Sequence, residues 1–253
     1  MSAATVVRAP SPLLLALEAR APWEYLAGVA AQPLLRHTPR GDGHPVLVLP
    51  GMAASDVSTR PLRAFLRARG YHAHGWKLGR NTGNRERYER LALRLLALHA
   101  RHGRRVSLIG WSLGGIVARE LAKQHPQAVR QVITLGSPFA GPARASNAWR
   151  LYEWLSGQRT EDGPAHRALR EPPPVPVSAV YSRSDGIVAW QSCRETPGPQ
   201  RENIEVIASH CGLGHHPAVL NAVADRLAQP EGQWAPFVAD GLWRWCYPRP
   251  TAP

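Results

Sequence analysis

Short, continuously apolar stretches alternate along this chain with longer amphipathic ones, and this alternation constrains the fold more than any other feature of the sequence. Residues 46–49 form one such apolar run, which ends at Pro50-Gly51. Such runs are typical of strands that are buried on both faces of a parallel sheet. Strands that alternate with helices predict right-handed βαβ units, which place helices on both faces. We therefore predict an α/β fold with a mostly parallel sheet.

The predicted strands share a short apolar core that ends near a glycine, a proline or a polar residue. They are 46–49, 71–76, 106–110, 129–135, 177–181 and 204–208. The predicted helices share apolar side chains at a spacing of three or four residues. They are 59–69, 85–102, 116–125 and 218–227. Because 253 residues is a common length for one α/β domain, we predict a single domain over residues 1–253.

Two segments fall outside this alternation. Residues 1–40 are predicted to form a helical N-terminal extension, with breaks at Pro22 and Pro33. Its apolar spacing indicates either a helix that packs on the domain's own core or one that lies on a membrane surface. Residues 138–176 form an insertion between two predicted strands, and connections of this length usually carry a function such as that of a lid.

A serine stands at a sharp predicted turn between a strand and a helix. Residues 110–114 are Gly-Trp-Ser-Leu-Gly, directly after a predicted strand. In this context the pattern Gly-x-Ser-x-Gly is typical of a turn that lifts a serine hydroxyl out of the sheet, because bulky flanking side chains would not fit there. The helix that follows directs the positive end of its dipole at the reacting group. Ser112 is the predicted nucleophile; the alternative is a glycine-rich turn with an incidental serine.

A serine hydroxyl needs a base that takes its proton, and a histidine oriented by a carboxylate can be that base. With a turn of this kind the order along the chain is Ser, then Asp or Glu, then His, each after a strand. His210 comes directly after the predicted strand 204–208, whereas His166 lies in the insertion. We predict His210 as the base, with His216 and His215, beside the start of the last helix, as the alternatives.

The carboxylate must lie between the serine and the histidine, after a strand. Asp185 follows the predicted strand 177–181, and its alternative role is to cap the turn before Gly186. The other acidic residues lie in the insertion, beyond the loop or in the next strand: Asp162, Glu195, Glu202 and Glu205. Acyl transfer also needs two donors for the developing oxyanion. We predict the backbone N–H groups of Leu113 and of Met52, which lies in the loop after the first strand.

Several stretches together resemble the α/β-hydrolase superfamily. They are residues 110–115 around the serine, Leu-Pro-Gly at 49–51 and Ser-His-Cys-Gly-Leu at 209–213. Residues 132–139 are similar to the segment that follows the serine turn in bacterial lipases and esterases. The His-x-Gly-Leu pattern is similar to the histidine segment of small bacterial lipases, which favours His210 over His216. The similarity covers roughly residues 44–228.

This resemblance implies hydrolysis of carboxylic esters through an acyl-enzyme, with no metal or organic cofactor. The residues that take the family's roles are Ser112, Asp185, His210 and the amides of Met52 and Leu113. A thioesterase or a polyester depolymerase would use the same groups. A hydrolase-fold protein that binds a lipid or a partner without catalysis is the alternative of another class, although such a protein has no need of an intact Ser, Asp and His set.

The substrate is less well encoded. The chain departs from the family at Trp111, where many relatives have histidine, and at Pro50-Gly51, where many lipases have His-Gly. The predicted substrate-binding residues are Trp111, Phe139, Trp149 and Trp154; Met52, Tyr152 and Leu155 are further candidates for an acyl pocket. An aromatic stripe at helical spacing is also typical of an ordinary core. An apolar lid together with positive charge predicts lipid esters at an anionic surface.

The charge and the cysteine content restrict the kinds of partner and the cellular compartment that we expect. The formal net charge is +13, yet the basic residues are spread along the chain, so we expect no nucleic-acid partner and keep an anionic membrane surface as a candidate. We see no signal peptide, and the longest apolar run, 13–17, is too short to span a membrane, so we expect a cytoplasmic protein. No cysteine has zinc spacing. A disulfide between Cys193 and Cys211 would tie the loop that carries Asp185 (the acid loop) to the loop that carries His210 (the base loop). Free thiols are the alternative.

Overall fold

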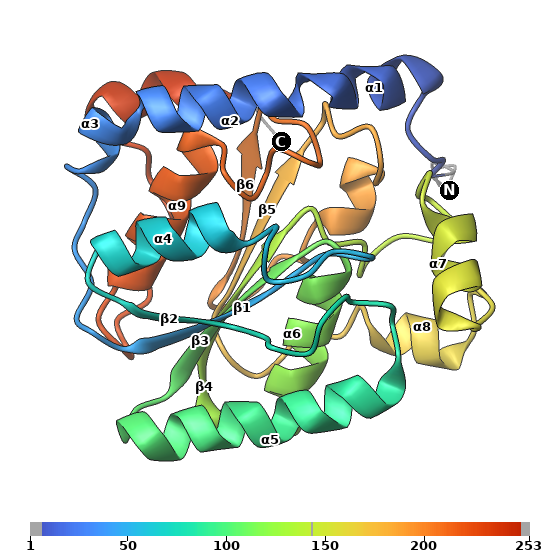
Figure 1. Cartoon of the computed structure of the whole chain (residues 1–253), viewed down its shortest axis with the longest axis horizontal. Helices are drawn as coiled ribbons and strands as arrows, with labels where there is room; N and C mark the ends of the chain where they lie inside the picture. The colour runs from blue at the N-terminus through green and yellow to red at the C-terminus, as the bar shows by residue number, and fades with distance from the viewer. Residues whose placement is uncertain (1–6, 143, 249–253) are drawn as a thin grey trace.

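A parallel β-sheet of six strands forms the centre of the computed structural model, which describes residues 7–142 and 144–248. The strands follow the order β2-β1-β3-β4-β5-β6, and neighbours run parallel (Figure 1). Their bounds are β1 Pro45–Leu49, β2 His72–Gly75, β3 Val106–Trp111, β4 Val129–Leu135, β5 Val177–Ser182 and β6 Arg201–Val206. The order reverses between β1 and β3, and open α/β sheets bind ligands at such a reversal, outside the carboxyl ends of the strands.

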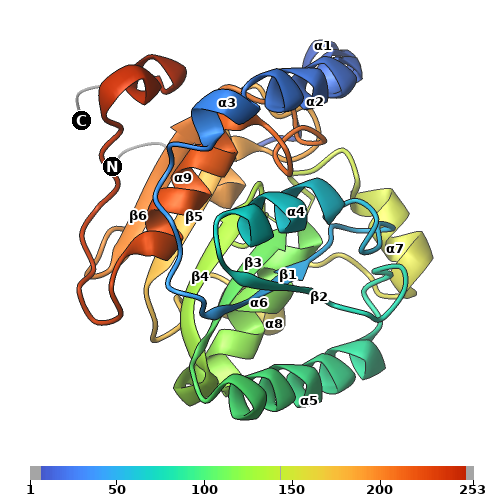
Figure 2. The ribbon, with the colours of Figure 1, turned by 60° about the vertical axis from the view of Figure 1, so that its left-hand side comes forward.

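Helices cover both faces of this sheet (Figure 2). The helices, with η for a 3-10 helix, are α1 Pro12–Ala16, η1 Leu17–Arg20, α2 Ala21–Ala30, α3 Gln32–Leu35, α4 Arg60–Ala68, α5 Arg85–His102, α6 Leu113–Gln124, η2 Pro126–Ala128, α7 Trp149–Ser156, α8 Pro164–Ala168, η3 Trp190–Cys193, α9 Pro217–Ala228 and η4 Gly241–Cys246. The ends of α5 illustrate why these segments are helical. The side chain of Asn84 accepts a hydrogen bond from the amide of Glu86, and Gly103 ends the helix in the left-handed conformation.

Apolar side chains on both faces explain why the central strands form. Every residue of β1, β4 and β5 is buried. In β1, Val46 and Val48 belong to the core beneath α4 and α9, whereas Leu47 and Leu49 belong to the core beneath α5 and α6. Successive side chains of a strand point to opposite faces, so an uninterrupted apolar run is buried on both sides. The predicted α/β fold with a parallel sheet is confirmed.

The structure corrects three details of the predicted elements. Helix α6 begins at Leu113, directly after the serine, because its glycine-rich first turn is helical rather than part of the preceding loop. Strand β6 covers Arg201–Val206 rather than 204–208, because polar residues at this sheet edge pair with β5. The short elements α8 and η4 have little apolar periodicity and were not predicted.

The N-terminal segment runs along one edge of the molecule as a row of short helices, α1, η1, α2 and α3 (Figure 1). The breaks fall near the prolines, as predicted: Pro22 starts the second helical stretch and Pro33 lies in the first turn of α3. Residues 1–6 of the predicted extension lie outside the described residues. Over the described ranges, no helix has both the length and the apolar character that crossing a membrane requires.

A buried ion pair ties the insertion to the helix that follows the serine. Arg119 of α6 forms an ion pair with Glu195, and both side chains are buried. The same guanidinium donates to the carbonyl of Glu171, at the end of the insertion (3.1 Å), and lies 3.8 Å from the ring centre of Phe139. This cluster therefore connects α6, both ends of the insertion and the chain before β6.

Removal of one partner of this pair is expected to destabilise the fold strongly. Glu195→Ala leaves the buried charge of Arg119 without its counterion, which costs roughly 3–5 kcal/mol in comparable cases. Urea unfolding followed by circular dichroism measures the loss. The double variant Arg119→Met/Glu195→Leu is the control, because it removes both charges and should recover most of the stability. A loss below about 1 kcal/mol in Glu195→Ala would contradict this role.

Candidate active site

The turn between β3 and α6 holds Ser112 in a backbone conformation that residues with a side chain rarely adopt. Its φ is 53° and its ψ is −121°. A side chain at Gly110 would collide with the backbone of Gly114, and one at Gly114 would collide with the carbonyl of Leu49. The strand and the helix approach this closely only because both positions are glycine. Strain of this kind is concentrated at functional sites.

Asp185 and His210 form a buried hydrogen bond at the carboxyl edge of the sheet. Asp185 lies in the loop after β5 and His210 in the loop after β6, and Nδ1 of the histidine lies 2.6 Å from Oδ2 of the aspartate. The relative exposures are 2% for Asp185 and 5% for His210. The second carboxylate oxygen accepts hydrogen bonds from the amides of Ile187 and Val188, both at 2.8 Å. The carboxylate is thus fixed on one side while it orients the imidazole on the other.

Two sets of contacts place this pair beside the serine turn. The amide of Ser112 donates to the carbonyl of Leu135 at the end of β4 (2.8 Å). A Cβ atom on the next residue, Gly136, would lie 3.1 Å from Nδ1 of His210 and 3.2 Å from Oδ2 of Asp185. In addition, the indole N–H of Trp111 donates to the carbonyl of His210 (3.0 Å). The end of β4 therefore has the serine on one side and the His–Asp pair on the other.

The surroundings of His210 favour its protonated form. Burial lowers the pKa of its imidazole, but the charge of Asp185, the hydrogen bond to that carboxylate and the charge of Glu18 together outweigh burial. The net result is a pKa above the ordinary value for histidine. The two carboxylates therefore stabilise the positive charge that the imidazole gains when it accepts a proton.

The loop after β1 lies against the serine. A Cβ atom on Gly51 would lie 3.4 Å from Cβ of Ser112. Asn81, which is buried, holds this loop: its side chain donates to the carbonyl of Pro50 (2.9 Å), and its backbone exchanges hydrogen bonds with Ala53 and Ala54. No pattern in the sequence points to Asn81, because its role depends on a loop that is distant along the chain.

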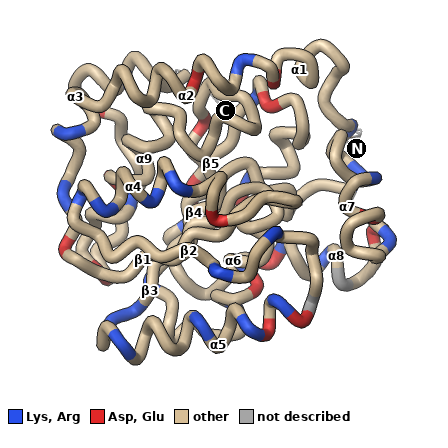
Figure 3. Tube along the Cα trace, in the orientation of Figure 1, with Lys and Arg blue, Asp and Glu red and all other residues tan. Residues whose placement is uncertain are grey.

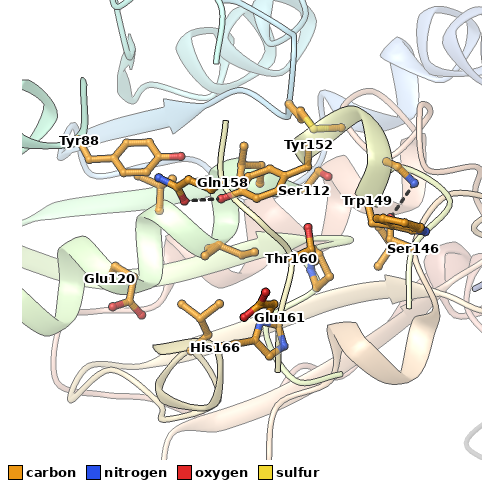
Figure 4. A pocket seen from close by; sticks show the side chains of 18 of the residues that line it. Tyr88, Ser112, Glu120, Ser146, Trp149, Tyr152, Gln158, Thr160, Glu161 and His166 are labelled. Atoms are coloured by element: carbon orange, nitrogen blue, oxygen red, sulfur yellow. Dashed lines mark hydrogen bonds between the residues drawn. The ribbon is translucent and has the colours of Figure 1, made fainter. Parts of the chain in front are cut away.

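A cavity of about 620 Å³ opens at Ser112 (Figure 4). Met52 and Leu113, the predicted oxyanion residues, line it together with the serine. One face of α6 forms its floor, with residues 113, 116, 117, 120, 121 and 124 at helical spacing. The insertion forms another wall, and Trp149 of this wall lies across the cavity from Tyr88 of α5 (Figure 4).

Three of the four predicted substrate-binding residues do not line this cavity. Phe139 is fully buried beneath the guanidinium of Arg119. Trp154 is 78% exposed on the outer side of α7. Trp111 points to the His210 loop, where it donates its hydrogen bond. Trp149 does line the cavity. The two tryptophans of α7 lie on different faces of that helix, and the sequence alone does not show which face is turned to the cavity.

Glu18 of the N-terminal segment holds the loops of Asp185 and His210 in place, a role that no pattern in the sequence indicates. One carboxylate oxygen accepts hydrogen bonds from the amides of Gly186 and His210, both at 2.8 Å. The other accepts one from the amide of Cys211 at 2.9 Å. Glu18 therefore bridges the residue after Asp185 and the backbone of His210 itself.

A second glutamate of the same segment completes this arrangement. Glu24 accepts a hydrogen bond from the amide of Ser209 (2.8 Å) and another from its hydroxyl. Arg20 forms an ion pair with Glu24 (3.0 Å) and also donates to the carbonyl and the hydroxyl of Ser184, both at 2.9 Å. The two loops are thus attached to the N-terminal helices through three charged side chains.

The structure assigns other places to the alternative histidines and to the cysteines. Nε2 of His215 lies 3.2 Å from the carbonyl of Ala21, and His216 caps α9. Cys193 and Cys211 are free, so the disulfide considered above is absent. Burial raises the pKa of the Cys193 thiol, and burial with the charge of Glu18 raises the pKa of Cys211 to about 12. Among the described residues, no three His, Cys, Asp or Glu side chains gather as a metal site.

Comparisons with known proteins agree with this architecture. A family model described as a PGAP1-like alpha/beta domain matches residues 86–166, from α5 through the serine turn into the insertion. A search of curated proteins found no match. Aspergillus fumigatus lipase B superposes with a TM-score of 0.61 at 18% identity, over 74% of this chain and 53% of the lipase, so this chain spans about half of that protein's length.

Two bacterial structures match over nearly their whole length. The mature form of Bacillus licheniformis lipase BlEst2 has a TM-score of 0.54 at 16% identity, over 76% of this chain and 95% of that one. A pyrethroid hydrolase from Sphingobium faniae JZ-2 has a TM-score of 0.50 at 19% identity, over 74% of this chain and 98% of that one. Identities this low show a common fold rather than a common substrate. The protein has the α/β-hydrolase fold.

Proposed function

We propose that this protein hydrolyses carboxylic esters through an acyl-enzyme on Ser112. The observation that carries the proposal is the buried hydrogen bond between His210 and Asp185 next to a serine held at a positive φ. A hydrogen-bonded carboxylate that orients an imidazole is the arrangement that turns a serine hydroxyl into a nucleophile. A binding protein gains nothing from a buried acid–base pair beside a strained serine. The fold likeness to lipases and a pyrethroid hydrolase supports the same conclusion.

The reaction follows from the roles of these groups. Nε2 of His210 takes the hydroxyl proton of Ser112 while Oγ attacks the ester carbonyl, and the amides of Met52 and Leu113 stabilise the oxyanion. The ester C–O bond then breaks, and the alcohol leaves with the proton held by His210. A water molecule then gives a proton to the same imidazole and attacks the acyl carbonyl. The bond between the acyl carbon and Oγ breaks, His210 returns the proton to Oγ, and the acid leaves free Ser112. Thioesters would follow the same steps with a thiol as the leaving group.

The shape of the cavity favours an extended acyl group. Its floor follows α6 from Leu113 to Gln124, which corresponds to about 16 Å at the helical rise per residue. The apolar side chains of Ile116 and Val117 lie near the serine end of this floor, and the polar side chain of Gln124 lies at its far end. We infer that the acyl chain lies along this helix and that its carbonyl end meets Ser112.

Loss of the nucleophile is expected to abolish activity. Ser112→Ala should lower kcat on the order of 10⁶-fold, as triad deletions do in other serine hydrolases, and leave the fold unchanged. Labelling with a fluorophosphonate, together with hydrolysis of p-nitrophenyl esters and thioesters, measures both consequences. Ser58→Ala, at a serine outside the cavity, is the control and should keep full labelling. A wild-type chain that neither labels nor hydrolyses any ester would support the non-catalytic alternative.

The pH dependence should report the charge of Glu18. The base must be neutral, so activity rises with pH through the pKa of His210, which lies above its ordinary value. The charge of Glu18 contributes to raising that pKa, so Glu18→Gln should move the acid limb of kcat/KM to lower pH. Glu24→Gln is the matched control. It removes the charge of the glutamate that holds Ser209, and this charge is not among the causes that shift the pKa of His210. Equal shifts in both variants would reject a specific effect of Glu18.

A bulky residue on the cavity floor should shorten the accepted chain. Ile116 is half-buried, lines the cavity and lies one turn beyond Leu113. Ile116→Trp should lower kcat/KM for p-nitrophenyl decanoate at least about ten-fold relative to the acetate, because displaced methylenes lose their apolar contacts. The acetate rate is the internal control. An unchanged decanoate-to-acetate ratio would show that the acyl chain lies elsewhere.

A further inference from the structure

The outer face of the N-terminal helices carries no charged side chain. Residues 12–35 contain three charged residues, Glu18, Arg20 and Glu24, and all three are partly buried in contacts with the acid and base loops. Figure 3 shows the consequence, since the trace through α1 and α2 is uncharged over most of its length. The segment thus directs its charges inward and leaves apolar residues outside.

Large apolar side chains cover this outer face. Trp23 is 72% exposed and Leu13 is 70% exposed. The other exposed members are Leu15, Leu17, Tyr25, Leu26 and Val29. Helix η4 lies along the same upper edge of the molecule in Figures 1 and 2, and it adds exposed Leu242 and Trp245. Exposed apolar side chains that gather at one edge of a molecule mark a site of interaction.

Charge identifies the kind of partner. Exposed arginines border the apolar segment, with Arg8 before α1 and Arg36 and Arg40 after α3. The whole chain has a formal net charge of +13, so a second copy of the chain would be repelled, whereas an anionic surface would be attracted. Tryptophan and tyrosine next to arginine suit the interface of a bilayer, where the ring enters the headgroup region and the cation meets lipid phosphate.

We propose that the N-terminal helices, together with η4, bind the protein peripherally to a bilayer that contains anionic lipid. The apolar side chains enter the interface while the helices lie parallel to the membrane plane. The inner side of the same helices stays attached to the acid and base loops through Glu18 and Glu24. This inference does not depend on ester hydrolysis, because its test measures binding alone.

Co-sedimentation with vesicles tests the proposal on the full chain. Wild-type protein should sediment with vesicles of phosphatidylcholine and phosphatidylglycerol, less with phosphatidylcholine alone, and less at high salt. Trp23→Glu/Leu26→Glu should weaken binding at least about ten-fold, because the apolar burial is lost. Val57→Glu/Leu93→Glu is the matched control: both residues are exposed and apolar, lie outside this face and introduce the same two charges.

Further measurements keep the outcome decisive. A second pair on the same face, Leu13→Glu/Val29→Glu, should also lose binding, and thermal unfolding should be unchanged in every variant because all substituted residues are exposed. The proposal is overturned if wild-type protein does not sediment with anionic vesicles, or if both pairs on this face bind as the control does. Sedimentation velocity that shows a wild-type dimer, dissociated by Trp23→Glu/Leu26→Glu, would instead assign the face to self-association and overturn the proposal.

Discussion

The close approach of β3 and α6 across a single residue is the constraint on which the rest of the site depends. Gly110 and Gly114 permit that approach, and the turn forces Ser112 to a positive φ. The strained backbone places the hydroxyl at the carboxyl edge of the sheet, where the loops after β1, β5 and β6 also end. The position of the cavity along α6 follows from this turn, because the helix begins directly after Ser112.

The acid and base loops have a different support. They lie on the outer side of the sheet, after β5 and the edge strand β6, where fewer neighbouring strands hold them. Glu18 and Glu24 supply oxygen acceptors for backbone amides that would otherwise be left without partners. Carboxylates that accept several amide bonds fix a loop firmly and also add negative charge near His210. Geometry and electrostatics at this edge therefore come from the same side chains.

The sequence predicted the features whose signals are local. The apolar run 46–49 marked a strand because both of its faces are buried. The order Ser112, Asp185 and His210, each after a strand, placed three residues at one edge of the sheet. Contacts between distant segments left no periodic signal, so the role of Glu18 was missed. The position of the aromatic residues could not be predicted for a related reason: Trp154 faces solvent, and the sequence does not show which side of its helix faces the cavity.

The attachment of Glu18 to the backbone of His210 joins positions separated by 192 residues. During synthesis the first helices leave the ribosome long before the loop that they must hold exists. Glu18 and His210 can meet only after all six strands have been made, and contacts so far apart in sequence are slow to form. The order of translation therefore keeps the candidate site incomplete until the loop after β6 has been synthesised.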